Sequence, residues 1–85
     1  MNKVILIGRL TKDVEMRYSA SNNTAIARYT LAVNRPFKRV GEPEADFLPC
    51  VAFNKTAEFA EKYLAKGIRV AIEGRIQTGS YTNSE

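Results

Sequence analysis

Residues 46–53 have the alternating pattern of a β-strand that carries two phenylalanine rings on one face. Successive strand side chains point to opposite faces of a sheet. The face with the rings consists of Phe47, Pro49, Val51 and Phe53, and the opposite face consists of Leu48, Cys50 and Ala52. The second set would suit a small, tightly curved core. The pattern therefore leaves two arrangements open, with both rings buried or both rings facing outward.

Residues 3–10 predict a strand that is apolar on both faces, in which Gly8 permits a sharp bend or bulge. One face carries Val4 and Leu6, and the other carries Ile5 and Ile7. Such a strand is buried on both sides, yet a domain of 85 residues has a thin core. We therefore predict a contact between subunits through this strand, with an ordinary central strand as the alternative.

Alternation also predicts strands at residues 24–34 and 68–77, and a shorter extended segment at 14–18 before a polar turn. The inward positions of these two long strands are Ala25, Ala27, Tyr29, Leu31 and Val33, then Ile68, Val70, Ile72 and Ile76. Gly74 marks a second bend. If the alternation continues beyond residue 77, Arg75 and Tyr81 share the outward face.

Residues 56–66 predict one helix, with Asn54 or Thr56 as its N-cap and Gly67 as its stop. Its apolar stripe consists of Ala57, Phe59, Ala60, Tyr63 and Leu64. This spacing places Phe59 in the core.

Phe37 lies in a predicted loop after Pro36, among the cations Arg35, Lys38 and Arg39. Loops run over the protein surface, so a ring at this position has no strong structural role. The position favours a binding function over a ring that folds back onto the core.

Composition narrows the function classes. The chain has 13 Lys and Arg against 9 Asp and Glu, a net charge of +4, one cysteine and no histidine. A basic folded surface weakly favours an acidic partner such as nucleic acid. Without histidine a zinc site or a general base has few candidates, and Cys50 is best placed as a small core residue. No apolar run is long enough for a membrane span or a signal peptide, so we expect a cytoplasmic protein.

The order of the elements predicts an all-β domain with one helix. A helix between the third and fourth strands of a small curled antiparallel sheet is the layout of the OB-fold, a partly open Greek-key barrel. That fold presents its second and third strands to oligonucleotides, and these elements carry Phe37, Phe47 and Phe53. Outward rings would form a platform on which nucleic-acid bases stack.

Five segments together resemble the bacterial single-stranded DNA-binding protein family. They are NKVILIGRL at residues 2–10, ARYTLAVNR at 27–35, ADF at 45–47, YLAKG at 63–67 and IEGRIQT at 72–78. They occur in the family's order and span nearly the whole chain. The resemblance implies one OB-fold domain over residues 1–85 that binds single-stranded DNA in replication, recombination and repair, near the bacterial nucleoid, without catalysis, metal or cofactor.

The resemblance also implies roles for particular residues. The stacking aromatics would be Phe37, Phe47, Phe53 and Tyr81. The phosphate contacts would be Arg35, Lys38, Arg39, Lys55, Lys66 and Arg75. A dimer of dimers would form through Lys3, Val4, Ile5, Leu6 and Ile7. The family often has tryptophan at three of the stacking positions, and this chain has none, so the stacking area per base would be smaller.

Two departures from the family pattern add expectations. The family's domain continues past the positions of residues 82–85 into a fifth strand, so we expect a barrel with its last strand missing and an open edge. The acidic tail that recruits replication and repair enzymes has no counterpart, so those partners are not expected.

Two other functions are compatible with a basic OB-fold. A protein-interaction or RNA-binding module of the replication machinery would retain its DNA affinity when the rings are replaced. An enzyme domain fits poorly, because histidine is absent and the acidic residues lack metal-ligand spacing.

Overall fold

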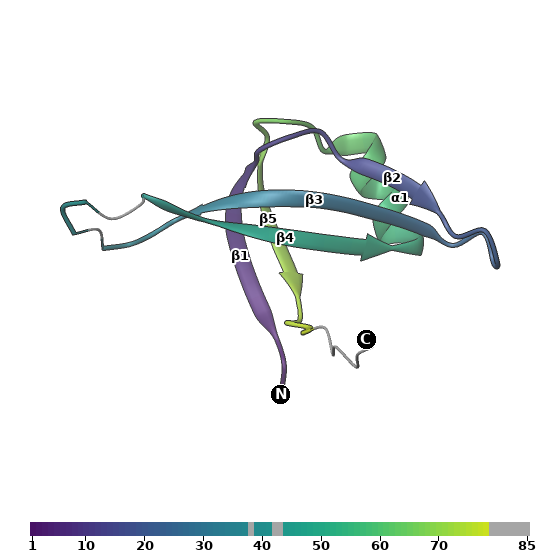
Figure 1. The fold of residues 1–85 in the computed structure, drawn as a ribbon, viewed down its shortest axis with the longest axis horizontal. Helices are drawn as coiled ribbons and strands as arrows, with labels where there is room; N and C mark the ends of the chain where they lie inside the picture. Colours follow the sequence, from purple (N-terminus) through teal and green to yellow (C-terminus); the bar gives the residue numbers. More distant parts are fainter. Residues whose placement is uncertain (38, 42–43, 79–85) are drawn as a thin grey trace, which may run out of the picture.

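The computed structural model describes residues 1–37, 39–41 and 44–78. Within these residues the chain forms one antiparallel sheet and one helix (Figure 1). The elements in order are β1 (Val4–Leu10), β2 (Glu15–Tyr18), β3 (Ala25–Asn34), β4 (Ala45–Phe53), α1 (Asn54–Tyr63) and β5 (Arg69–Gly74). The prediction of a mainly β fold with a helix between the third and fourth long strands is confirmed.

β3 is the centre of the sheet. β4 pairs along one edge of β3 over nine residues, from Ile26 opposite Phe53 to Asn34 opposite Ala45. β2 and then β1 pair along its other edge, and β5 pairs with the far side of β1. In Figure 1 the long β3–β4 hairpin therefore crosses the β1–β5 pair. Among the described residues no strand joins β4 to β5, so the sheet curls in the manner of an OB-fold without closing.

Gly8 lies where β1 crosses β3. A Cβ atom built on Gly8 would lie 2.5 Å from the backbone oxygen of Ala32. No real side chain tolerates such a contact, so glycine is needed here for the close approach of two backbones. The predicted bend at this position thus has a steric cause.

The core is built largely of small side chains. Leu10 and Leu31 are fully buried, and a cluster of alanines joins the sheet to the helix. The cluster consists of Ala25 and Ala27 on β3, Ala52 on β4, and Ala57 and Ala60 on α1. Small residues let α1 lie close against β3 and β4, and the inward assignments of Ala25, Ala27 and Leu31 are confirmed.

The helix differs from its prediction at both ends. It begins at Asn54 after Phe53, which acts as N-cap without a side-chain hydrogen bond, and it ends at Tyr63 because Leu64 is extended. Gly67, the predicted helix stop, does have a positive φ of 87°, but it lies three residues beyond Leu64, where the helix has already ended. The prediction that Phe59 is core is wrong. Its ring is 57% exposed and packs instead on Tyr63, with ring centroids 4.8 Å apart.

Strands β1 and β5 are less buried than predicted. Val4 and Leu6 are half-buried, whereas Ile5 is 67% and Ile7 54% exposed. The single chain therefore covers only one face of β1. On β5, Val70 and Ile72 are half-buried, but Ile68 and Ile76 lie beyond the strand ends and are exposed.

Candidate nucleic-acid interface

Both phenylalanines of β4 face outward. Phe47 is 65% and Phe53 53% exposed, while Ala52 on the opposite face is buried and Leu48 and Cys50 are half-buried. The outward arrangement is therefore confirmed over the buried one. Burial raises the pKa of the Cys50 thiol, which disfavours the thiolate form that acts as a nucleophile.

The strand register defines one continuous surface, here called the ring face. It consists of Phe47, Pro49, Val51 and Phe53 on β4, with Ala32, Thr30, Arg28 and Ile26 opposite them on β3. Because residues opposite one another in a sheet point to the same side, each β4 side chain has its β3 partner beside it. The two rings stand six residues apart along β4, about 20 Å at the usual rise of a strand.

Three arginines outside the predicted set of phosphate contacts lie on this surface or in line with it. Arg28 is opposite Val51, between the rings and nearer to Phe53. Arg17 pairs with Ile26, the partner of Phe53, and Arg9 pairs with Ala32, the partner of Phe47. Arg28 lies between the predicted inward positions Ala27 and Tyr29, so alternation alone directs it outward, but the register that brings three strands into line cannot be read from one sequence.

Among the three predicted stacking rings that the structure describes, Phe37 is the most exposed, at 89%, and it lies beyond the strand-paired part of the β3–β4 hairpin. Its exposure agrees with a loop ring that does not fold back onto the core. Tyr81 and Lys38 lie outside the described residues.

Arg35, a predicted phosphate contact, forms an ion pair with Asp46. Its Nη2 and Nε donate to Oδ1 of Asp46 at 2.7 and 3.2 Å. The hydrogen bond from Arg35 holds the pKa of the Asp46 carboxyl below its usual range, and the same bond raises the pKa of Arg35. Arg35 is thus partly neutralised and is a weaker candidate for phosphate than the sequence suggested.

The other predicted phosphate contacts are dispersed rather than gathered. Lys55 is exposed in the first turn of α1, two residues after Phe53, whereas Lys66 follows the other end of the helix. Arg75 lies past the end of β5, six residues from Arg69, which pairs with Arg9. Arg39 is exposed in the hairpin loop. Of this group, Lys55 is the cation nearest in sequence to the ring face.

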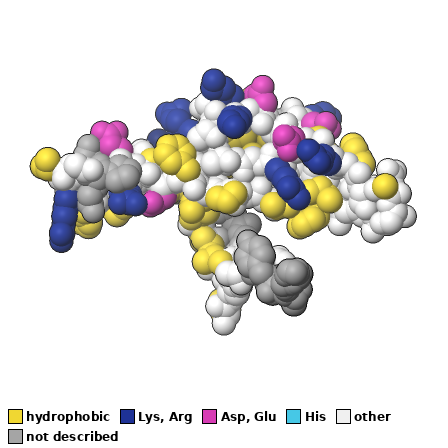
Figure 2. Space-filling view, viewed as in Figure 1, with side chains coloured by type: hydrophobic (Ala, Val, Ile, Leu, Met, Phe, Trp, Pro, Cys, Tyr) yellow, Lys and Arg dark blue, Asp and Glu magenta, His cyan; other side chains and the backbone are white. Residues whose placement is uncertain are grey.

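Cations and apolar side chains are interspersed over the molecule, as Figure 2 shows for one face. In the described part of the chain, no three Cys, Asp or Glu side chains gather as a metal site would require. Nor does any described helix have the length and apolar character to cross a membrane.

A curled antiparallel sheet with one intervening helix and exposed rings among arginines is the architecture of an oligonucleotide-binding OB-fold. The sequence matches the model of the Single-strand binding protein family over residues 1–85. The chain belongs to this family.

Several curated relatives of the chain are named for binding single-stranded DNA. The chain is 58% identical to "Single-stranded DNA-binding protein" of Clostridium perfringens, over 95% of this chain and 52% of the relative. It is 54% identical to the protein of that name in Halalkalibacterium halodurans, over 100% of this chain and 51% of the relative. It is also 54% identical to "Single-stranded DNA-binding protein 1" of Streptococcus pyogenes, over 100% and 65%. The chain thus spans between about half and two thirds of these relatives.

Proposed function

We propose that this chain is a single OB-fold domain that binds single-stranded DNA without sequence preference and protects it during replication, recombination and repair. The observation that carries this proposal is the ring face, where two outward rings flank an arginine. Bases stack on aromatic rings whatever their identity, and cations along the path neutralise phosphates. Binding of this kind requires no catalysis, and we place it in the cytoplasm.

The proposal is tested by fluorescence anisotropy with a labelled oligothymidylate and a labelled duplex hairpin, each at two or more salt concentrations. A duplex hides the faces of its bases, so the single strand should bind more tightly. Each phosphate contact contributes about 0.7 to the slope of log K against log salt on single strands. Three or more contacts should therefore give a slope of about −2 or steeper.

The control ligand is an oligouridylate of equal length. Tighter binding of the RNA than of the DNA would favour an RNA-binding module. A flat salt response, or no preference for single strands over the duplex, would contradict the proposed function.

We further propose that the chain forms a homo-oligomer, a dimer of dimers, through the exposed face of β1. Ile5 and Ile7 project from this face, and Ala71 of β5 lies opposite Ile7. Two large aliphatic side chains left in water on one face of a strand are a typical site of protein association.

Replacing Ile5 and Ile7 with serine should raise the dissociation constant at least about tenfold, since each buried isoleucine contributes about 1.5–3 kcal/mol. Sedimentation at matched concentrations measures this shift. Val40→Ser, which removes an exposed apolar side chain from the hairpin loop, is the control. A parent chain that sediments at 9.5 kDa at all concentrations would overturn the proposal.

A further inference from the structure

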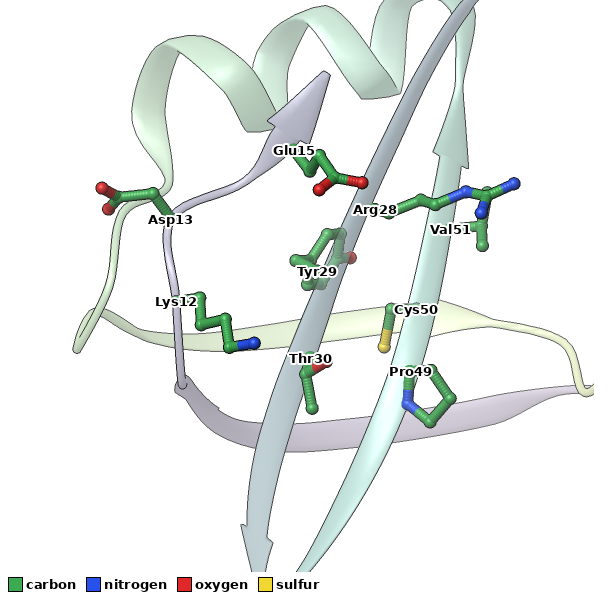
Figure 3. Close-up of a pocket in the computed structure, with 9 residues that line it drawn as sticks. All are labelled: Lys12, Asp13, Glu15, Arg28, Tyr29, Thr30, Pro49, Cys50 and Val51. Carbon is green, nitrogen blue, oxygen red and sulfur yellow. The ribbon is translucent and has the colours of Figure 1, made fainter. Parts of the chain in front are cut away.

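A cavity of about 310 Å³ lies in the middle of the ring face. Figure 3 shows it between the β1–β2 connection, which supplies Lys12, and strands β3 and β4. β3 contributes Arg28 and Thr30, and β4 contributes Pro49 and Val51. The cavity thus occupies the stretch between Phe47 and Phe53 where β4 has no aromatic side chain.

The charges around this cavity are unequally engaged. Asp13 also borders it, but its Oδ1 accepts a hydrogen bond from the backbone N–H of Lys66 at 2.8 Å. Glu15 is engaged by Arg17, a cation that does not border the cavity. The Nε atom of Arg17 lies 3.9 Å from Oε1 of Glu15. Lys12 and Arg28 form no ion pair within the described residues. Two cations therefore remain available to a ligand.

The spacing of the rings determines which part of a DNA strand lies here. Bases stacked on Phe47 and Phe53 would be about 20 Å apart along β4, so the sugar-phosphate backbone that joins them must cross the intervening surface. Pro49 and Val51 offer no aromatic ring for a base, and the ring of Tyr29, which also borders the cavity, is half-buried and packs against the core cluster. Lys12 and Arg28 offer ammonium and guanidinium donors, which suit a phosphate.

We propose that Lys12 and Arg28 hold the phosphodiester backbone of the bound strand on the stretch between the two stacking rings. The inference rests on the proposed function and adds to it a path, running lengthwise along β4 from one ring, over this cavity, to the other. Glu15 lies opposite Arg28 in the register of β2 and β3, and its carboxylate weakens the site by repelling the phosphate.

The test compares salt slopes and affinities for oligothymidylate among charge-neutralising variants. Arg28→Gln should lower the slope by about 0.7, the value of one phosphate contact, and weaken binding about fivefold at moderate salt. Lys12→Gln should act in the same direction. Lys62→Gln is the matched control, because Lys62 is exposed on α1 beside Tyr63, and its slope should equal that of the parent.

Glu15→Gln distinguishes a phosphate from a base at this site. A phosphate ligand predicts tighter binding by this variant, since a repelling carboxylate is lost. If Glu15 and Arg28 instead hold the edge of a base, this variant should bind more weakly. The parent should then also distinguish an oligothymidylate from one that carries a single guanine or cytosine.

Each outcome separates this inference from the proposed function. If the parent fails to bind single-stranded DNA, the proposed function falls and this path falls with it. If the parent binds with a steep salt slope but neither Arg28→Gln nor Lys12→Gln changes that slope, only the path is wrong. Weaker binding by Glu15→Gln likewise overturns the phosphate assignment alone. Equal thermal midpoints of the variants and the parent show that all of them are folded.

Discussion

Replacing Phe47 and Phe53 together with alanine is expected to weaken binding of oligothymidylate at least about 30-fold. Each stacked ring contributes about 1–3 kcal/mol per base, and 1.4 kcal/mol corresponds to a factor of ten in affinity. Because neither ring carries a charge, the slope of log K against log salt should stay at the parent value. Anisotropy titrations at several salt concentrations measure both quantities.

The matched control for the rings is Tyr63→Ala. Tyr63 is an exposed aromatic residue at the end of α1, about 15 Å of helix away from Phe53, so its loss should leave DNA affinity unchanged. Both rings of β4 are more than half exposed, and their removal should not unfold the chain. An affinity that survives the double substitution would favour the protein-interaction module over the stacking platform.

The course of β4 could be predicted from sequence because alternation is a local property. Side chains two residues apart share a face whatever the rest of the fold does. The choice between rings inward and rings outward was left open by the pattern itself. It is decided by what packs on the other face, where Ala52 meets Ala57 and Ala60 of the helix.

Phe59 shows why helical spacing alone misplaced a ring. Its position on the apolar stripe of the helix is correct, but α1 lies so close to the sheet that alanines fill the contact. A phenylalanine one position before Ala60 is then directed to the border of the groove between α1, β4 and β5. The size of the space between two elements is a tertiary property, which residue spacing does not contain.

The arginines of the ring face were missed for a related reason. Arg9, Arg17 and Arg28 come from three strands, and only the register aligns them with the β4 side chains. The family resemblance predicts phosphate contacts at cations near the rings in sequence, such as Arg35. The structure shows that Arg35 is engaged with Asp46, whereas Arg28 has no ion pair among the described residues.

Gly8→Ala is expected to destabilise the folded chain by about 1–3 kcal/mol, the usual cost of forcing an extra methyl group into a packed site. The new Cβ would meet the Ala32 oxygen at 2.5 Å and its carbonyl carbon at 3.1 Å. Backbone atoms cannot move aside as a flexible side chain would, so β1 must shift away from β3. Urea unfolding should show a lower midpoint with an unchanged m-value.

Gly74→Ala is the control for this experiment, because nothing lies within 4 Å of a Cβ built there and its φ is not positive. This variant should be neutral or more stable by about 0.5–1 kcal/mol, since alanine loses less conformational freedom than glycine on folding. Equal stability of Gly8→Ala and the parent would show that β1 and β3 can separate at little cost. The ring face depends on the same crossing, since Ala32 lies between Arg9 and Phe47. Loss of DNA binding by Gly8→Ala should therefore follow the fraction of unfolded chain, and the salt slope of the folded fraction should match that of the parent.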